Sequence, residues 1–186
     1  MNLIKYFLII FISLIITVKA SSNEELIKKI KEGKKIIFIR HAYAPGNGDP
    51  KNFNINDCST QRNLSQEGKN QAKLIGLSFA KHNIPIENVF SSEWCRCTET
   101  ASIAFDEKYQ KKFFLNSFYD ERFSKNKEKQ IKELKKFVNN WKGKKNLIFV
   151  THYVLISEIL NVNPSSGEIV ISDKDYKVIG KLNSNF

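Results

Sequence analysis

The sequence is poor in two residues that build many reactive and metal-binding centres: its 186 residues include only three cysteines and three histidines. Cys58, Cys95 and Cys97 lack the number and spacing of ligands that a zinc site requires. In an oxidising compartment, three cysteines allow one disulfide and one remaining thiol. Because Cys95 and Cys97 are only two positions apart, we expect Cys58 to pair with one of them.

The chain also lacks an apolar run of the length that spans a bilayer. Lys5 precedes an almost wholly apolar stretch over residues 6–18, which is about 13 residues against the roughly 20 that a span needs. Small residues at Val18 and Ala20 then provide a cleavage site. These features predict a signal peptide over residues 1–20, a mature domain over 21–186 and a periplasmic or secreted location. An uncleaved signal anchor is the alternative, and it is the only membrane contact that we expect.

Arginine is scarce in this strongly basic chain, because 26 of its 30 cationic residues are lysine. The formal net charge is +11, and it falls to +9 without Lys5 and Lys19 of the predicted signal peptide. The lysines are spread along helices and loops with no basic stripe interleaved with aromatics, so we expect no nucleic-acid partner. They are typical of a solvated face, with a polyanion-binding patch as the alternative.

The four arginines invite a more specific explanation. They stand at positions 40, 62, 96 and 122. A guanidinium is planar, permanently charged and able to bond an anion through two parallel N–H groups, which lysine cannot do. These positions are therefore candidates for anion binding.

Strand and helix patterns alternate along the chain, with no internal repeat and no evident linker. Short apolar and β-branched runs predict strands, and apolar residues at helical spacing after capping signals predict helices. The expected strands cover residues 35–39, 88–91, 113–115, 147–150, 168–172 and 176–182, the last two as a hairpin. The expected helices cover residues 22–31, 64–82, 93–105, 129–141 and 153–160. This alternation predicts an α/β fold with helices on both faces of a mostly parallel sheet.

Two of the three histidines stand directly after the two most apolar strands. His41 follows the run at 36–39 after one residue, and His152 follows the run at 147–150 in the same way. Ligands of parallel sheets bind beyond the carboxyl ends of the strands, so both imidazoles are candidates for one site. His82 ends a helix among polar residues, and we expect it to be structural.

A third candidate segment follows another strand. Residues 91 and 92 are serines, and Arg96 lies in the first turns of the helix after them. Free amides at a helix start together with a guanidinium can bind an anion. An ordinary solvent-exposed arginine is the alternative.

Together these motifs resemble the histidine phosphatase superfamily, which has the phosphoglycerate-mutase-like fold. The matching segments are Arg40-His41, Leu64-Ser65-x-x-Gly68-x-x-Gln71-Ala72, Ser91-Ser92-x3-Arg96-x2-Glu99-Thr100-Ala101 and Val150-Thr151-His152. The resemblance implies a three-layer α/β/α sandwich with a mostly parallel central sheet. It also implies a phosphatase that acts through a phosphohistidine.

The resemblance assigns a role to each matching side chain. His41 is the expected nucleophile, and Arg40, Arg96 and His152 are the expected phosphate pocket; Arg62 either lines the site or anchors its loop. An attacking imidazole must be unprotonated, and neighbouring guanidinium charges lower its pKa. Arginine forks match the oxygens over which the charge of phosphoryl transfer spreads. We expect no cofactor and no metal in this scheme.

The proton donor and one backbone position follow the family pattern less well. Family members commonly carry an acid between the arginine helix and the second histidine, where we favour Glu121 over Asp120. The alternative is that this pair only neutralises Arg122 and nearby lysines. Ala42 stands where the family usually has glycine, and Tyr153 follows the second histidine, so no acid stands there.

These features predict a metal-independent phosphomonoesterase that acts on a small phosphorylated substrate outside the cytoplasm. The loop over residues 45–62 resembles that of small exported bacterial members of the superfamily. One branch of these resembles phosphatases assigned to phosphorylated sugars of the lipopolysaccharide core, and this resemblance makes a phosphorylated sugar of the cell envelope a candidate substrate. The alternatives are a phosphohistidine-protein phosphatase and a catalytically inactive phosphate- or polyanion-binding module.

Overall fold

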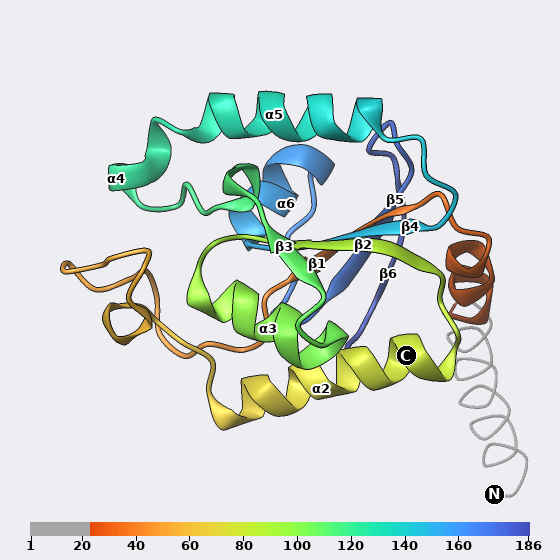
Figure 1. Cartoon of the computed structure of the whole chain (residues 1–186), viewed down its shortest axis with the longest axis horizontal. Coiled ribbons are helices and arrows are strands. Elements are labelled where there is room, and N and C mark those ends of the chain that lie inside the picture. The colour runs from red at the N-terminus through yellow and green to blue at the C-terminus, as the bar shows by residue number, and fades with distance from the viewer. Residues whose placement is uncertain (1–22) are drawn as a thin grey trace, which may run out of the picture.

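The computed structural model describes residues 23–186, in which one mixed sheet lies between two layers of helices (Figure 1). The strands are β1 (Ile36–Arg40), β2 (Ile86–Ser91), β3 (Tyr109–Lys111), β4 (Asn146–Thr151), β5 (Ile169–Ser172) and β6 (Val178–Leu182). The signal peptide predicted over residues 1–20 lies outside the described residues. Within residues 23–186, no helix combines the length and the apolar character needed to cross a membrane.

The strand order is β3-β2-β4-β1-β5-β6, which puts the two most apolar strands, β4 and β1, side by side at the centre. β3, β2, β4 and β1 pair in parallel. β5 and β6 pair antiparallel as the predicted hairpin, and β5 also pairs antiparallel with β1. The expected α/β fold with a mostly parallel sheet is confirmed.

The central strands are apolar throughout because they bury both faces. Along β1, Ile37 and Ile39 point into one apolar cluster, and Ile36 and Phe38 point into the other. Alternate residues of a strand face opposite sides of a sheet, so a strand between two helix layers needs apolar residues at every position.

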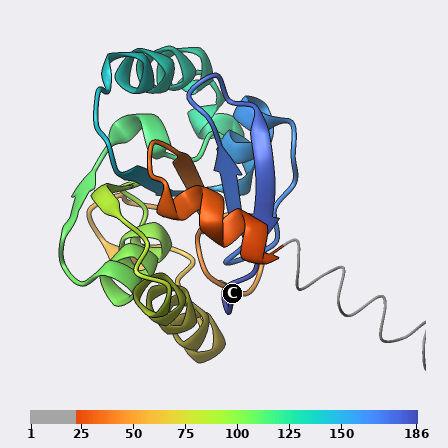
Figure 2. The same ribbon diagram turned by 90° about the vertical axis from the view of Figure 1, so that its right-hand side faces the viewer.

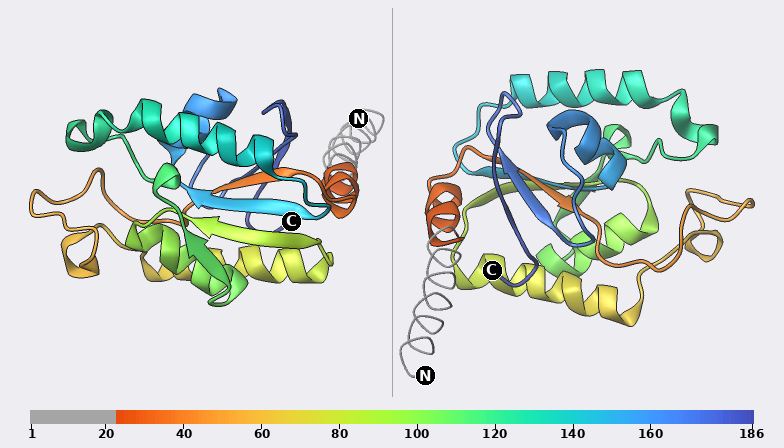
Figure 3. Two further views of the ribbon diagram at one scale, coloured as in Figure 1. Left: turned by 45° about the horizontal axis from the view of Figure 1, so that its top comes forward. Right: turned by 180° about the vertical axis from the view of Figure 1, so that it is seen from behind.

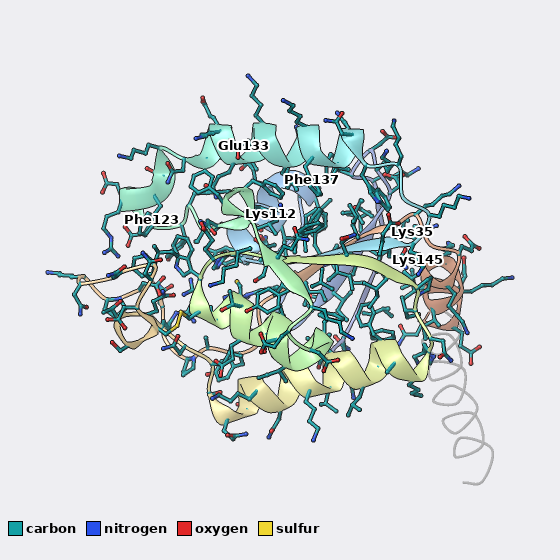
Figure 4. All side chains as sticks on the ribbon, in the orientation of Figure 1. Lys35, Lys112, Phe123, Glu133, Phe137 and Lys145 are labelled. Carbon is teal, nitrogen blue, oxygen red and sulfur yellow. A yellow bond between two sulfur atoms is a disulfide. The ribbon has the colours of Figure 1, made fainter. Side chains whose placement is uncertain are left out.

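The helices cover these two faces in pairs. α2 (Gln66–Lys81) and α3 (Cys95–Phe105) lie on one face, and α5 (Lys127–Asn140) and α6 (Tyr153–Leu160) lie on the other (Figure 1). Phe137 of α5 points toward the sheet, where it packs with Phe149 and its neighbours (Figure 4). The α2 helix begins where its sequence predicts, because the Oγ of Ser65 accepts a hydrogen bond from the amide of Gly68.

The expected strand over residues 113–115 is wrong. These residues form the 3-10 helix η2 (Phe113–Leu115), and the pairing with β2 ends just before them at Lys111. Phe114 and Leu115 are buried in the cluster under α5 and α6. Tertiary packing therefore accounts for their apolar character, which we had interpreted as strand propensity.

The two ends of the sheet differ. A helix over residues 23–31 lies across one end, near β5 and β6 (Figures 1 and 2), and Leu26 contacts Gly180 of β6. The long loop over residues 42–63, with the 3-10 helix η1 (Cys58–Thr60), lies at the opposite end together with α4 (Glu121–Ser124) (Figure 3). This second end is where the parallel strands finish.

Candidate active site

The carboxyl ends of β1, β4 and β2 bring both histidines to one place. The amide of His41 donates a hydrogen bond to the carbonyl of Thr151, at 2.9 Å, so the segments that follow β1 and β4 begin side by side. The rings of His41 and His152 have centroids 5.5 Å apart, and each residue is 2% exposed. The expected convergence of the two imidazoles is present.

Arg96 contacts both imidazoles. It is the second residue of α3, which starts four residues after the end of β2, and it is 3% exposed. Its Nε donates to the Nε2 of His41 at 3.2 Å, and its Nη2 is 3.4 Å from the Nδ1 of His152. The helix start thus presents a guanidinium to both rings at once.

Arg40 and Arg62 complete the cationic side of the site. Arg40 donates through Nη1 to the carbonyl of Pro164, at 2.9 Å, and its guanidinium lies 5.3 Å from the centre of the Tyr153 ring. Arg62 donates through Nε to the carbonyl of Gly48, at 2.9 Å, and through Nη1 to that of Ala44. Arg62 therefore lines the site and also anchors its loop.

All five of these side chains line one cavity with a volume of about 70 Å³. Its full lining is Arg40, His41, Gly46, Asn47, Gly48, Asp49, Arg62, Trp94, Arg96, Ser117, Tyr119, Asp120, Phe123, His152 and Tyr153. A cavity of this kind, with three guanidinium groups and two imidazoles, is suited to a small, multiply charged anion.

The hydrogen bonds of His41 identify its tautomer. Its Nδ1 lies 2.8 Å from the carbonyl of Ala42, which can only accept, so Nδ1 carries the proton. The Nε2 atom then holds a lone pair on the cavity side. Burial and the charge of Arg96 lower the pKa of His41 well below its usual range. The ring is therefore neutral at pH 7, as a nucleophile must be.

His152 is oriented by a short chain of polar groups. Ser92 donates its hydroxyl proton to the Oδ1 of Asn116, at 3.0 Å, so it accepts from the Nε2 of His152, at 2.9 Å. The Nδ1 of His152 thus presents a lone pair toward Arg96. Burial, Arg96 and His41 lower the pKa of His152 well below its usual range. Both histidines of the site are neutral in this state.

Asp49 also lies in the cavity, and our sequence interpretation did not single it out. Its carboxylate bonds Arg96 through both oxygens, Oδ1 to Nη1 at 2.8 Å and Oδ2 to Nη2 at 3.2 Å. It also accepts from the amide of Arg62 and from the Nε1 of Trp94, each at 3.1 Å. The only sequence signal was its place in a Gly-Asp-Pro turn within a long loop, which does not reveal a partner 47 residues away.

The structure separates the two candidate proton donors. Asp120 lines the cavity, whereas Glu121 is exposed on α4 and is not among the lining residues. Asp120 caps α4 and forms an ion pair with Arg122, with Oδ2 to Nη2 at 2.8 Å. Hydrogen bonds from Arg122 lower the pKa of Asp120. Asp120 is therefore the better placed of the two, but it is ionised in this state.

A disulfide joins the long loop to the helix that carries Arg96. Cys58 pairs with Cys95, so one of the two expected pairings is present, and the bond is visible in yellow in Figure 4. The Oε1 of Gln61 also accepts from the amide of Cys95, at 2.9 Å. Cys97 is free and buried, and burial raises the pKa of its thiol to about 12. These contacts hold the loop over the site.

Ala42, which replaces the usual glycine, fits its position without backbone strain. It does not adopt a positive φ, so an L-residue is unstrained there. Its amide donates to the Oγ1 of Thr100, at 3.0 Å, and Thr100 donates in turn to the carbonyl of Arg96, at 2.7 Å. The backbone after His41 is thus linked to the helix of Arg96.

Residues 23–186 contain no group of three or more histidine, cysteine, aspartate or glutamate side chains that could hold a metal ion.

Comparisons with known proteins agree with this architecture. A structure of the protein histidine phosphatase SixA complexed with tungstate has a TM-score of 0.56 at 15% identity, covering 81% of this chain and 97% of its own. A proposed alpha-ribazole-5'-P phosphatase of Escherichia coli K-12 has a TM-score of 0.58 at 15% identity, covering 82% and 97%. A proposed phosphohistidine phosphatase SixA of Agrobacterium tumefaciens has a TM-score of 0.53 at 16% identity, covering 80% and 97%. At these identities the likeness is one of fold.

A search of curated protein sequences gave no match. The sequence model of the histidine phosphatase superfamily (branch 1), however, matches residues 36–146, which is more than half of the chain. The matched residues include His41, Arg62 and Arg96 and end before His152. In the structure, His152 lines the same cavity as these three residues. The chain therefore belongs to the histidine phosphatase superfamily, and it is a phosphatase.

Proposed function

We propose that the protein is a metal-independent phosphomonoesterase in which His41 forms a phosphohistidine intermediate. The observation that supports this most directly is the neutral His41 ring, whose Nε2 lone pair faces the guanidinium of Arg96 in a cavity lined by three guanidinium groups. A nucleophile for phosphoryl transfer needs that lone pair, and the transferring oxygens need those fixed donors.

The reaction would proceed in two displacements. The Nε2 of His41 attacks the phosphorus atom, a P–N bond forms and the P–O bond to the leaving group breaks with its electron pair. Water then attacks the phosphohistidine, so the P–N bond breaks, inorganic phosphate leaves and the Nε2 lone pair is restored. Arg40, Arg62 and Arg96 stabilise the charge on the three non-bridging oxygens, because they carry full charges and are already positioned. His152 lies beside His41, faces the Nη2 of Arg96 and completes the pocket.

The leaving oxygen needs a proton if it would otherwise depart as an alkoxide. The carboxylates among the lining residues are Asp49 and Asp120, and each forms an ion pair with a guanidinium. Of the donors considered, Asp120 is therefore the one that we propose, since Glu121 is exposed on α4 and does not line the cavity. An ionised donor favours substrates whose leaving group needs little protonation, so we expect steep dependence of the rate on leaving-group pKa.

Two tyrosines at the mouth of the cavity support a small substrate that carries a ring. Tyr119 is 47% exposed, and its ring centroid lies 5.8 Å from that of Tyr153. Both residues line the cavity beside Arg40, where the non-phosphoryl part of a substrate would leave the pocket. Aromatic side chains provide a large apolar surface against which a ring can pack. A phosphorylated sugar of the cell envelope is our proposed natural substrate, with a periplasmic or secreted location for the enzyme.

Phosphohistidine on a protein is the second candidate substrate, and the site itself gives a reason for it. A P–N bond to imidazole breaks more readily than a P–O bond to an alcohol, so it makes less demand on a proton donor. The ion-paired states of Asp49 and Asp120 suit such a substrate. The names of two structural neighbours also include this activity.

The decisive experiment measures hydrolysis of p-nitrophenyl phosphate by wild type and His41→Ala, with and without EDTA. We expect EDTA to have no effect and the substitution to abolish turnover together with the acid-labile labelled phosphoenzyme. His82→Ala is the matched control, since His82 is the one histidine outside the cavity among the described residues. Turnover that survives His41→Ala would refute the proposal.

A panel then identifies the substrate class. It compares an envelope-type sugar phosphate, an aryl phosphate and a phosphohistidine peptide by kcat/KM. The highest value for the sugar phosphate supports our main proposal, and the highest value for the peptide supports the second candidate. Binding of phosphate without turnover of any ester would instead indicate an inactive phosphate-binding module.

A further inference from the structure

The phosphate pocket of the ligand-free protein already contains an anion of the chain itself. The carboxylate of Asp49 has a side chain only 8% exposed, and it bonds both terminal nitrogens of Arg96. This side-by-side arrangement is the one through which a guanidinium binds two oxygens of a phosphate. Asp49 and a substrate phosphoryl group would therefore compete for the same face of Arg96.

Arg96 has no donor left over for a substrate in this state. Its Nε–H bonds His41, two N–H groups bond Asp49, and the remaining two face His152 at 3.4 Å and the carbonyl of Arg62 at 3.4 Å. A guanidinium has five N–H groups in all, so each has an acceptor. The bond from Nε also covers the Nε2 lone pair of His41 with which the reaction starts. Substrate binding must therefore break bonds that Arg96 makes here.

Arg40 has the spare capacity that Arg96 lacks. Its Nε is buried and has no hydrogen-bond partner among the described residues, although the guanidinium lines the cavity. A buried N–H without a partner is costly, and an entering anion would relieve that cost. Arg40 thus keeps donor capacity for an anion that enters the cavity.

Two glycines with positive φ precede Asp49 in an exposed part of the loop. Gly46 and Gly48 have φ values of +91° and +66°, which glycine adopts without strain. Residues 45–47 are exposed, and a Cβ added at Gly48 would meet nothing within 4 Å. If the carboxylate swings away from Arg96, it also gives up its bonds to the amide of Arg62 and to the Nε1 of the buried Trp94, so an incoming anion must compensate for these as well.

We propose that Asp49 is a displaceable occupant of the phosphate site, held by Arg96 in the free enzyme and exchanged for the phosphoryl group of the substrate. This rests on the proposed function in one respect, that a phosphoryl group is the ligand. With Asp49 in place, one carboxylate partly neutralises the three guanidinium charges of the cavity. The affinity for free phosphate is therefore lower, and product phosphate dissociates faster. The opposite role, in which Asp49 merely positions Arg96 for the ligand, predicts opposite results.

The first test is calorimetric titration of wild type and Asp49→Asn with orthovanadate and with inorganic phosphate. Asparagine keeps the shape but removes the competing charge, so we expect at least about a tenfold lower Kd, equal to about 1.4 kcal/mol. Asp106→Asn is the matched control, because it removes one exposed negative charge at the far end of α3 by the same change of side chain. An unchanged or higher Kd in Asp49→Asn would overturn the proposal.

The second test uses the wild-type protein and so does not depend on how the variant folds. Hydrogen exchange is followed at the amide of Arg62, which donates to Asp49 at 3.1 Å, with and without saturating vanadate. Displacement of Asp49 should make this amide exchange faster, whereas a positioning role should leave it equally or better protected. Neither test requires turnover. Tighter binding without hydrolysis would therefore contradict the proposed function alone, and weaker binding in an active enzyme would contradict this inference alone.

Discussion

Acidification should destabilise this protein well before its carboxylates titrate, because His41 and His152 are buried as neutral rings. Burial is the main cause that lowers the pKa of each below its usual range, and Arg96 is the next. In the unfolded chain both return to a pKa of about 6.5, so below that value the unfolded state binds protons that the folded state does not. The stabilisation is therefore fully present above about pH 6.5 and is lost as the pH falls.

The size of the effect follows from the number of groups. If each ring stays neutral in the folded protein, lowering the pH from 7 to 5.5 removes about 1.3 kcal/mol per histidine, or about 2.5 kcal/mol in total. That is a large part of the 5–15 kcal/mol by which an ordinary domain is stable. The interval also lies above the range in which carboxylates protonate, so their contribution is small there.

Urea unfolding at the two pH values measures this loss directly. The variant His152→Gln should lose about half as much as wild type over the same interval, and His41→Gln with His152→Gln should lose almost nothing, by the same linkage. His82 is present in every variant, so its contribution is common to all of them. A wild-type free energy of unfolding that is constant or rises toward pH 5.5 would show that the two imidazoles are not held neutral.

Three further predictions concern the loop, the backbone after His41 and the rate. Replacing Cys58 and Cys95 together by alanine should lower the free energy of unfolding by about 3.8 kcal/mol, because the disulfide closes a loop between residues 37 positions apart and so restricts the unfolded chain. A loss of less than about 1 kcal/mol in urea unfolding would contradict this chain-entropy argument. Gly68→Ala should destabilise the fold by about 1–3 kcal/mol and lower kcat, because the Cβ of the alanine would collide with the carbonyl oxygen of Tyr43. A melting temperature and an activity equal to those of wild type would contradict this. The value of kcat/KM should stay nearly level from about pH 7.5 to pH 6, because the lowered pKa of His41 keeps it neutral, whereas a limb centred near pH 6.5 would indicate an unperturbed ring.

Much of the catalytic framework could be predicted because it depends on local patterns. The apolar runs of β1 and β4 identify strands buried on both faces, and a residue just after such a strand must lie at the ligand-binding edge of a parallel sheet. The sequence alone could therefore predict that His41 and His152 share one site. Arg96 could be added because a helix must start soon after β2. Each of these predictions needed only the local pattern of residues along the chain.

Loops and long-range contacts were decided by the tertiary structure. Asp49 meets Arg96 across 47 residues, and its surroundings carry no periodicity that could have indicated the contact. The choice of Asp120 over Glu121 as the lining residue depends on how α4 sits beside the loop over residues 42–63. The apolar residues 113–115 suggested a strand until packing against α5 explained them. The sequence by itself thus determined which elements form and what their ends present, whereas only the folded chain decided which loop groups share the cavity, since side chains far apart in sequence meet only after the whole core has packed.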